Sequence, residues 1–308
     1  QLAIGRRQKP CILRDSPLSD IQAGHWEEIN IRIFPAFSKY ERKREKRMKY
    51  VVCFSGGHSS ALAAVETVFR HGRKNTILLN HDISSKVEDE DVKRFKQEVA
   101  DYLDLPIVYV NRENFQTDTP LSLCRQMNMI RFGAGSSICT YYLKTEPFQK
   151  WLQESYPVRR GEISGEITLV YGFDGYEPHR IARRKKHLLW QGYLSEYPLA
   201  DKLTESHLED IREIGIELPA TYKMAKHANC KGCLKAGKQH WYMVYCLWPE
   251  IFWEAVETER MLGYSIISGQ FLIELEPLFD CMKNVGIMPR DNECSAMFWA
   301  RVRKVLGM

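Results

Sequence analysis

Short apolar runs alternate with amphipathic segments between residues 50 and 110 of the 308-residue chain. Runs of β-branched and aromatic residues predict strands, and apolar residues that recur every three or four positions predict helices. Strands are expected at Tyr50–Phe54, Thr76–Leu79 and Pro106–Val110, with helices at Ser60–His71 and Asp89–Leu103. Because the strands are almost wholly apolar and each is followed by a helix, the pattern predicts an α/β fold: a parallel sheet with helices on both faces.

The pattern changes twice after residue 110. Residues 112–137 contain Pro120, Gly133 and Gly135 and predict a long loop region, followed by a helix at Thr145–Glu154 and a strand at Ile167–Tyr171. Beyond Pro198 the chain is expected to be mostly helical, with helices at Thr204–Ile214, Trp241–Leu262, Pro277–Met282 and Ala296–Val305, interrupted by a loop at Cys230–Gly237. We therefore divide the chain into an irregular basic N-terminal extension (1–48), an α/β domain (49–200) and a mostly helical C-terminal region (201–308).

The composition adds limits on location and chemistry. No apolar run approaches the roughly 20 residues of a membrane span, and Gln1–Pro10 lacks the apolar core of a signal peptide, so we expect a cytoplasmic protein without a membrane partner. The nine cysteines are then expected to be reduced thiols, some of them ligands of a metal or cluster.

The positive charge of the chain is small in total but locally dense. The formal net charge is +5, whereas residues 39–49 alone contain seven Lys or Arg and residues 180–186 contain five. Such clusters fit a polyanionic partner, DNA or tRNA, and they also fit a solvated surface. The sequence leaves both interpretations open, together with the oligomeric state.

The stretch Ser55-Gly56-Gly57-His58-Ser59-Ser60 is the most informative motif. It ends the first apolar run and precedes the first helix. Two glycines let the backbone approach an anion, the serines donate hydrogen bonds, and the free N–H groups at the start of the helix add positive potential. The motif predicts a nucleotide-phosphate loop, and the alternative is an ordinary turn of small residues. It lacks the Gly-Lys-Ser/Thr of a Walker A sequence.

This loop resembles the S-G-G-x-[DS]-S signature of the PP-loop ATP pyrophosphatases, and other segments are similar to the branch that contains phosphoadenosine phosphosulfate (PAPS) reductases. In chain order these segments are Ile77–Asp82, Cys139–Pro147 (C-x-x-x-L-K-x-x-P), Tyr171–Arg180, Tyr197–Lys223 and Cys230–Cys233 (C-x-x-C). The resemblance covers residues 50 to 260. It implies an adenine nucleotide alpha hydrolase-like fold and an adenosine nucleotide, ATP or PAPS, as ligand.

The resemblance also assigns candidate residues. Ser55, Gly56, Gly57, Ser59 and Ser60 match the positions that hold phosphate or sulfate, and His58 is a further candidate phosphate contact or a solvent-facing residue. Gly172, where the second loop begins, is a further nucleotide-binding candidate. Catalytic candidates are Asp82, near the ribose, adenine or a metal ion, or a helix cap; Lys144 and Arg180, as cations for the anion; and Asp174, in the second loop. Asp174 replaces an arginine of the family. A carboxylate there favours Mg²⁺-ATP over a sulfonucleotide, because it attracts Mg²⁺ and repels a bare sulfate.

Cysteines in the matching segments imply a metal centre. In cluster-bearing relatives a Cys-Cys pair joins the later C-x-x-C to hold a [4Fe–4S] cluster. Here Cys139, Cys230 and Cys233 match, Ile138 fills one ligand position, and Cys124 or Cys246 is the candidate fourth ligand. A cluster, a zinc ion and a set of ordinary thiols all stay open.

Three functions follow as hypotheses. The first is ATP-dependent adenylylation of an acceptor, such as DNA or tRNA, with release of pyrophosphate and transfer of sulfur or nitrogen from a donor protein. The second is reduction of PAPS or its analogue to sulfite with a thiol reductant, and the third is nucleotide sensing without catalysis. The first is favoured, because Asp174 alters the anion clamp and Glu293-Cys294-Ser295-Ala296 lacks the E-C-G-L-H tail of the reductases.

Overall fold

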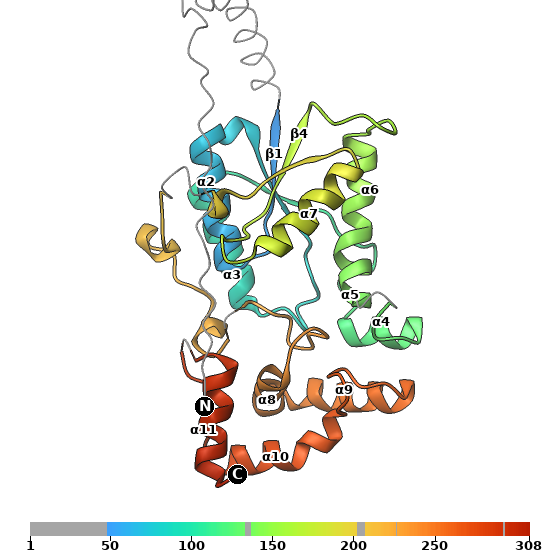
Figure 1. The fold of residues 1–308 in the computed structure, drawn as a ribbon, viewed down its shortest axis with the longest axis vertical. Coiled ribbons are helices and arrows are strands. Elements are labelled where there is room, and N and C mark those ends of the chain that lie inside the picture. Colours follow the sequence, from blue (N-terminus) through green and yellow to red (C-terminus); the bar gives the residue numbers. More distant parts are fainter. Residues whose placement is uncertain (1–47, 133–136, 202–206, 226, 292) are drawn as a thin grey trace, which may run out of the picture. The chain divides into compact units, whose positions relative to one another are not determined.

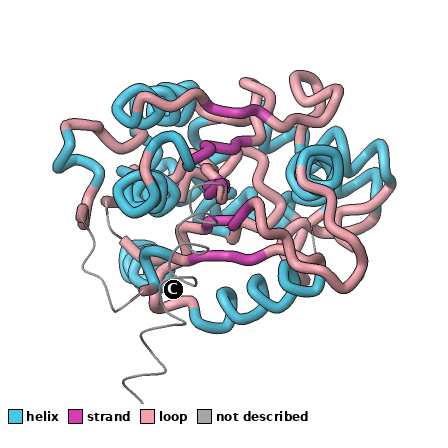
Figure 2. Tube along the Cα trace, turned by 90° about the horizontal axis from the view of Figure 1, so that it is seen from above, coloured by secondary structure: helices cyan, strands magenta, loops and turns pink. Residues whose placement is uncertain are grey.

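The computed structural model describes residues 48–132, 137–201, 207–225, 227–291 and 293–308. The predicted N-terminal extension lies outside these residues except for Met48. Within them, five strands form one sheet in the order β3-β2-β1-β4-β5, and every neighbouring pair is parallel (Figures 1 and 2). The strands are β1 (Lys49–Cys53), β2 (Thr76–Asn80), β3 (Ile107–Tyr109), β4 (Ile167–Val170) and β5 (Leu194–Glu196). The predicted parallel α/β sheet is confirmed.

Helices cover both faces of this sheet because successive strand residues point to opposite sides. Tyr50 and Val52 of β1 pack in a core with α2 (His58–His71) and α3 (Glu90–Leu103). Val51, between them, packs in a second core with α6 (Glu146–Ser155) and α7 (Pro178–Trp190). Figure 1 shows α2 and α3 on one side of the strands and α6 and α7 on the other.

The strand order places a topological switch point between β1 and β4. From β1 the chain proceeds outward to β2 and β3, whereas β4 lies on the other side of β1 and leads to β5. In open parallel sheets the loops diverge at such a point and leave a crevice at the carboxyl ends of the strands. The Ser55–Ser60 loop follows β1, and the loop that begins at Gly172 follows β4, so the two predicted loops lie at this switch point.

Two elements near the sheet lie where the pattern predicted no helix. The long loop expected over 112–137 is wrong for part of its length, because α4 occupies Pro120–Met127. Thr119 caps this helix by accepting a hydrogen bond from the Ser122 N–H at 3.0 Å, and Pro120 fits the first turn. Helix α7 was also missed, because only Leu188 among its residues is buried and the apolar period is weak.

The C-terminal region is mostly helical, as expected, but its boundaries differ. The single helix predicted at Trp241–Leu262 is wrong: α8 (Lys238–Leu247) ends before Trp248, and α9 (Pro249–Leu262) begins with Pro249. A residue before proline is pushed out of the helical region, and Trp248 accordingly has φ −139° and ψ 63°. Helices α10 (Leu272–Asn284) and α11 (Ser295–Leu306) contain the two later predicted helices.

The helix predicted at Thr204–Ile214 is wrong for its described residues, of which only Ile211–Ile214 forms a short 3₁₀ helix, η4. Residues 204–206 lie outside the described residues. The remaining short helical elements are η1 (Arg73–Asn75), α5 (Ile138–Thr140), the π-helix η2 (Tyr141–Thr145), η3 (Pro198–Ala200) and η5 (Ala220–Lys223).

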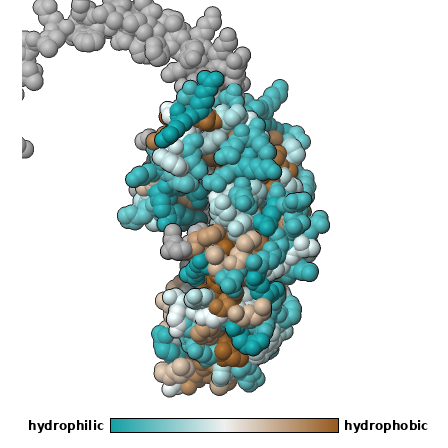
Figure 3. Space-filling model, turned by 90° about the vertical axis from the view of Figure 1, so that its right-hand side faces the viewer, coloured by the Kyte–Doolittle hydropathy of each residue, from teal (hydrophilic) through white to brown (hydrophobic). Residues whose placement is uncertain are grey.

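The helical part has its own apolar core, built around Trp241, Tyr242, Phe252, Phe279 and Phe298. Side chains of α4 and η2 also belong to this core, so it joins segments from both sides of residue 200. On the face seen in Figure 3, hydrophobic side chains gather in patches over the C-terminal helices, while hydrophilic ones predominate over the part that contains the sheet. Of the helices that the structure describes, none has the length and apolar character to cross a membrane.

The close approach of Gly172 to α2 generates a stability prediction. A Cβ atom at Gly172 would lie 2.4 Å from the backbone oxygen of Ser59, whereas one at Gly175 would meet nothing within 4 Å. We expect Gly172→Ala to lower the free energy of unfolding by about 1–3 kcal/mol, because backbone must shift to admit the methyl group. Gly175→Ala, in the same loop, should change it by less than about 0.5 kcal/mol. Chemical denaturation measures both, and equal effects would contradict the packing described.

Candidate functional site

The Ser55–Ser60 loop turns sharply from β1 into α2. Gly56 has φ +79°, a left-handed conformation that favours glycine, and a Cβ there would lie 2.8 Å from side-chain carbons of Lys96. The Ser60 hydroxyl is buried and donates to the Gly57 carbonyl oxygen at 2.8 Å, which closes the turn. Ser55 and Ser59 are exposed, so their side chains are accessible to a ligand in solution.

The His58 side chain contacts the start of the short helix η4. Its Nε2 accepts a hydrogen bond from the Ile211 N–H at 3.2 Å and lies 3.7 Å from Asp210. Burial lowers the pKa of His58, against the opposing effect of Asp210. In this arrangement His58 Nε2 acts as an acceptor.

Tyr222 covers the start of α2. Its hydroxyl oxygen accepts a hydrogen bond from the His58 N–H at 2.9 Å, and a Cβ at Gly57 would lie 3.3 Å from that oxygen. The N–H groups at a helix start are the usual contacts of a bound anion. Tyr222 thus occupies one of these donors, and a phosphate at His58 N–H requires the tyrosine hydroxyl to move or to share the contact.

The loop after β4 meets the same helix start through Gly172. Within this loop, the Asp174 carboxylate accepts a hydrogen bond from the Tyr176 N–H at 2.8 Å and so stabilises the loop's own turn. Arg180 donates to Glu177 at 2.6 Å, and its guanidinium carbon lies 4.0 Å from the centre of the Phe173 ring. Gly172 is therefore beside the first loop, while Asp174 and Arg180 have partners inside the second.

A buried charge cluster lies beneath the first loop. Lys96 of α3 is 1% exposed, and its Nζ lies 2.9 Å from Glu88, 3.3 Å from the Asn80 side-chain oxygen and 3.9 Å from Asp82. Lys93 pairs with Asp82 at 3.1 Å. Burial raises the pKa of Glu88, partly offset by Lys96. Asp82 is thus at the end of β2 and close to the loop, but its carboxylate is already neutralised by lysines.

Lys144 lies on the π-helix η2, in which each backbone hydrogen bond spans one residue more than in an α-helix. Short π-helical segments are often found at functional sites. Burial is the main cause that lowers the pKa of His81, the neighbour of Asp82, to about 4, and the charge of Lys144 contributes to the shift. Lys144 is therefore near His81. It also opposes the rise in the pKa of Cys139 and Cys230. Lys144 is therefore near both the end of β2 and the cysteines.

Four of the candidate cysteines, Cys124, Cys139, Cys230 and Cys233, are neighbours. Burial is the main cause that raises the pKa of Cys230 to about 12; Lys144 opposes the rise, and Cys233 and Cys139 contribute to it. Burial and then Cys233 raise the pKa of Cys139, while burial and then Cys139 raise that of Cys124 to about 12. The Lys231 N–H donates to the Val87 carbonyl at 2.8 Å and ties the C-x-x-C loop to the Glu88 segment. The chain brings these thiols together although Cys139 and Cys230 are far apart in sequence.

These thiols can hold a metal centre only if their sulfur atoms surround one point. A [4Fe–4S] cluster or a structural zinc ion is held by four side chains around one centre. Among the described residues, no three His, Cys, Asp or Glu side chains are arranged as a metal-binding group. The cysteines adjoin one another without closing on one point, so the predicted cluster and zinc ion stay predictions, and we derive no chemical step through them.

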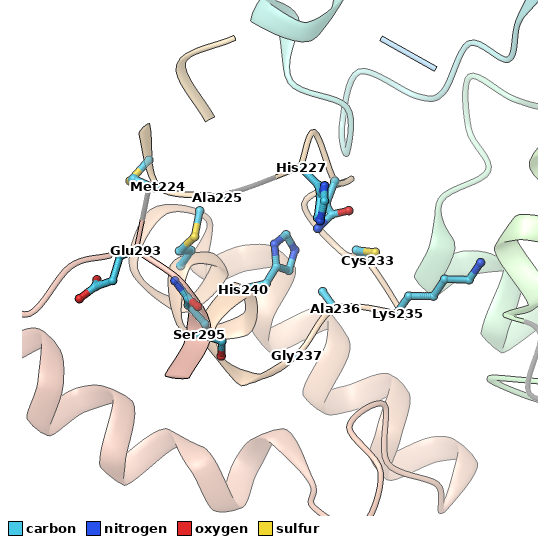
Figure 4. Close-up of a pocket in the computed structure, with 13 residues that line it drawn as sticks. Met224, Ala225, His227, Cys233, Lys235, Ala236, Gly237, His240, Glu293 and Ser295 are labelled. Atoms are coloured by element: carbon cyan, nitrogen blue, oxygen red, sulfur yellow. The ribbon is translucent and has the colours of Figure 1, made fainter. Parts of the chain in front are cut away.

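A cavity of about 420 Å³ adjoins the C-x-x-C loop on the side of the C-terminal helices (Figure 4). His227, Cys233 and His240 gather at one side of it, and Met224 and Glu293 lie at the other. His240 Nε2 donates to the Lys231 carbonyl at 2.9 Å, while its Nδ1 is buried without a hydrogen-bond partner among the described residues. Burial lowers the pKa of His240. The cavity is lined by residues after 223, not by the Ser55–Ser60 loop.

Several residues of this region were not found from the sequence. Lys96 lies beside Gly56 and Tyr222 accepts from His58, Glu88 pairs with Lys96, and His240 lines the cavity. Lys96 lies in an ordinary charged helix pattern and Glu88 lies just before that helix, so no local signal identifies them. A weak signal exists for His240, which follows the C-x-x-C pair by seven residues.

Comparison with models of known protein families gives no match for this sequence, and comparison with curated proteins finds none that is significantly similar. The PP-loop resemblance therefore stays a prediction from the motifs.

The buried lysine generates a second prediction. Lys96→Met leaves Glu88 without its cation, and we expect the free energy of unfolding to fall by about 3 kcal/mol at neutral pH. Lys93→Met, whose pair with Asp82 is partly exposed, should cost under about 1 kcal/mol. Replacing both members of the buried pair, Lys96→Met with Glu88→Leu, should recover most of the loss.

The same variant has an expected pH dependence. Without the cation, the pKa of Glu88 in the folded protein rises further above its unfolded value of 4.5, so the destabilisation is complete at high pH. It should shrink as the pH falls towards 4.5, because the folded state then takes up a proton. Urea denaturation across this range measures the difference from the unaltered protein, and a difference that grows as the pH falls would contradict the buried pair.

Proposed function

We propose that this chain is a PP-loop enzyme with an adenine nucleotide alpha hydrolase-like fold, which transfers the adenylyl group of Mg²⁺-ATP to an acceptor and releases pyrophosphate. The observation that carries the proposal is the contact between Gly172 and the Ser59 backbone. It joins the two predicted loops at the switch point of a parallel sheet, where such sheets bind ligands. The sequence resemblance and the sheet order support the same assignment independently.

The described residues have distinct roles in this proposal. The exposed Ser55 and Ser59 hydroxyls and the N–H groups at the start of α2 would bind the phosphates. Arg180 is exposed and would exchange its Glu177 partner for a phosphate oxygen. Asp82 and the buried Lys96 would hold the loop in position, because the Lys96 stem packs on Gly56. Catalysis would be mainly orientation and charge neutralisation.

The proposed reaction has two steps. An acceptor oxygen attacks the α-phosphorus of ATP, the bond between that phosphorus and the pyrophosphate oxygen breaks, and pyrophosphate leaves with the bonding electron pair. A sulfur or nitrogen nucleophile from a donor then attacks the acceptor carbon and displaces AMP, which keeps the acceptor oxygen. No net oxidation or reduction occurs in either step.

The surroundings of Cys294 favour this reaction over reduction of PAPS. A reductase of that branch needs a cysteine on a tail that reaches the nucleotide. Cys294 instead precedes α11 directly, and the Cys294 carbonyl accepts the Phe298 N–H at 2.9 Å in the first turn of this helix. A residue fixed in this way belongs to the helical core region.

Product analysis separates the hypotheses. Purified protein would be incubated with labelled ATP or labelled PAPS, with and without RNA or DNA. The proposal expects pyrophosphate from ATP in the presence of an acceptor, and AMP in addition when sulfide or ammonia is supplied as the donor. Sulfite from PAPS would establish the reductase instead, and nucleotide binding without any product would establish a sensing protein.

A variant of the first loop tests the site. Gly57 has an extended backbone (φ −97°, ψ 159°) that valine adopts without strain, so Gly57→Val should fold. Its side chain would fill the space in front of the α2 N–H groups, and we expect ATP affinity, measured by titration calorimetry, to fall at least about tenfold. Gly165→Val, where a Cβ meets nothing within 4 Å, is the matched control and should bind ATP normally. Unchanged affinity of Gly57→Val would remove the loop from the site.

A further inference from the structure

Helix α7 is unusual for a helix that covers a parallel sheet. Such helices normally bury an apolar stripe and expose a mixed polar face. In α7 only Leu188 is fully buried, and the sequence PHRIARRKKHLLW contains five Arg or Lys and no Asp or Glu. That is as many positive charges as the formal net charge of the whole chain, +5.

The solvent face of α7 has a regular order. His179, Arg183, Lys186 and Trp190 follow one another at spacings of four, three and four residues, so they form one stripe along the helix. All four are exposed, and Trp190 is 84% exposed. At about 1.5 Å per residue the stripe is about 16 Å long. We name these four residues the α7 stripe.

The stripe faces away from the contacts that hold α7 to the sheet. Ile181 and Leu188, seven residues apart, pack in the core with β4. Arg184 lies on their side, with its guanidinium carbon 5.1 Å from the centre of the Tyr171 ring. The sheet therefore uses one side of the helix, and the opposite side has no structural task that requires a basic or aromatic residue.

Nearby carboxylates do not neutralise the stripe. Glu177 pairs with Arg180, Glu196 of β5 pairs with His71, and Asp201 pairs with Arg70. Within the described part of the chain, no carboxylate forms an ion pair with Arg183 or Lys186. Unpaired cations in a row attract a polyanion, and an exposed tryptophan provides a flat surface for an unpaired base.

We propose that the α7 stripe binds a single-stranded segment of a nucleic acid, with Arg183 and Lys186 on phosphates and Trp190 stacked on a base. An anionic membrane fits less well, because the apolar side of α7 is buried against the sheet and cannot enter lipid. Duplex fits less well too, because its bases are already stacked and leave Trp190 without a partner.

The stripe leads towards the candidate nucleotide site. Helix α7 begins directly after the loop that contains Gly172, and Gly172 touches the first turn of α2. A single-stranded nucleic acid bound along α7 would therefore reach the loop that contains Gly172 at the N-terminal end of the helix. This identification of the acceptor rests on the proposed function, whereas binding by the stripe does not.

The experiment measures binding by fluorescence anisotropy, without ATP, using short labelled oligothymidylate and oligouridylate at several salt concentrations. Arg183→Ala with Lys186→Ala should weaken binding about tenfold or more and reduce the salt slope by about 1.4, or about 0.7 for each lost phosphate contact on a single strand. The matched control is Arg303→Ala with Lys304→Ala, which removes the same two residue types from exposed positions of α11 and should change affinity less than about twofold.

Variants of Trp190 test base stacking separately from the charge of the stripe. Trp190→Ala should weaken binding about tenfold at an unchanged salt slope, and Trp190→Phe should restore most of the affinity. Whichever of oligouridylate and oligothymidylate binds more tightly identifies RNA or DNA as the source.

Three results would overturn the proposal: equal losses in the α7 and α11 double variants, equal binding of a duplex and a single strand, or binding of phosphatidylserine vesicles but of no oligonucleotide. The Gly57→Val variant should bind oligonucleotides normally. In the unaltered protein, ATP binding without oligonucleotide binding would overturn the proposal for the α7 stripe alone, and oligonucleotide binding without ATP binding would overturn the proposed nucleotide site alone.

Discussion

The contact between the Gly172 backbone and the first turn of α2 determines how the rest of the site is arranged. Two parallel strands, β1 and β4, end side by side and send their loops in different directions. Because glycine has no side chain, the loop after β4 can lie directly on the backbone of Ser59 and Ser60. This contact fixes the start of the loop that leads through Asp174 to Arg180 and the basic helix α7.

A second constraint acts from the other side of the first loop. The stem of Lys96 lies against Gly56, and its ammonium group is surrounded by Glu88, Asn80 and Asp82. Such a buried ion pair contributes little net stability but is costly to break. It also links the loop after β1 to the end of β2. Val87, next to Glu88, accepts a hydrogen bond from the Lys231 N–H and so connects this cluster to the C-x-x-C segment. The loop is thus held between two rigid contacts.

Much of the fold, but less of the site, could be predicted from the sequence. The strands at Val51, Leu78 and Leu169 are buried on both faces and produce unmistakable apolar runs. The end of α8 before Pro249 has a local signal, because a proline restricts the preceding residue, Trp248. The aromatic pattern continues across this position, so the sequence analysis predicted one helix. Helix α7 was missed for the opposite reason: its outer face is basic, so hydrophobic periodicity is almost absent. Contacts such as Lys96 with Gly56, or Tyr222 with His58, depend on tertiary packing and have no local signal.

The central claim is that an adenosine nucleotide binds where the loops after β1 and β4 meet. The most direct measurement is a crystal structure of the protein with Mg²⁺ and a non-hydrolysable analogue of ATP. The account predicts phosphates against the N–H groups of the Ser55–Ser60 loop, with the Tyr222 hydroxyl displaced from, or sharing, the His58 N–H. A nucleotide bound only in the cavity beside Cys233 and His240, with Tyr222 still on His58, would contradict it.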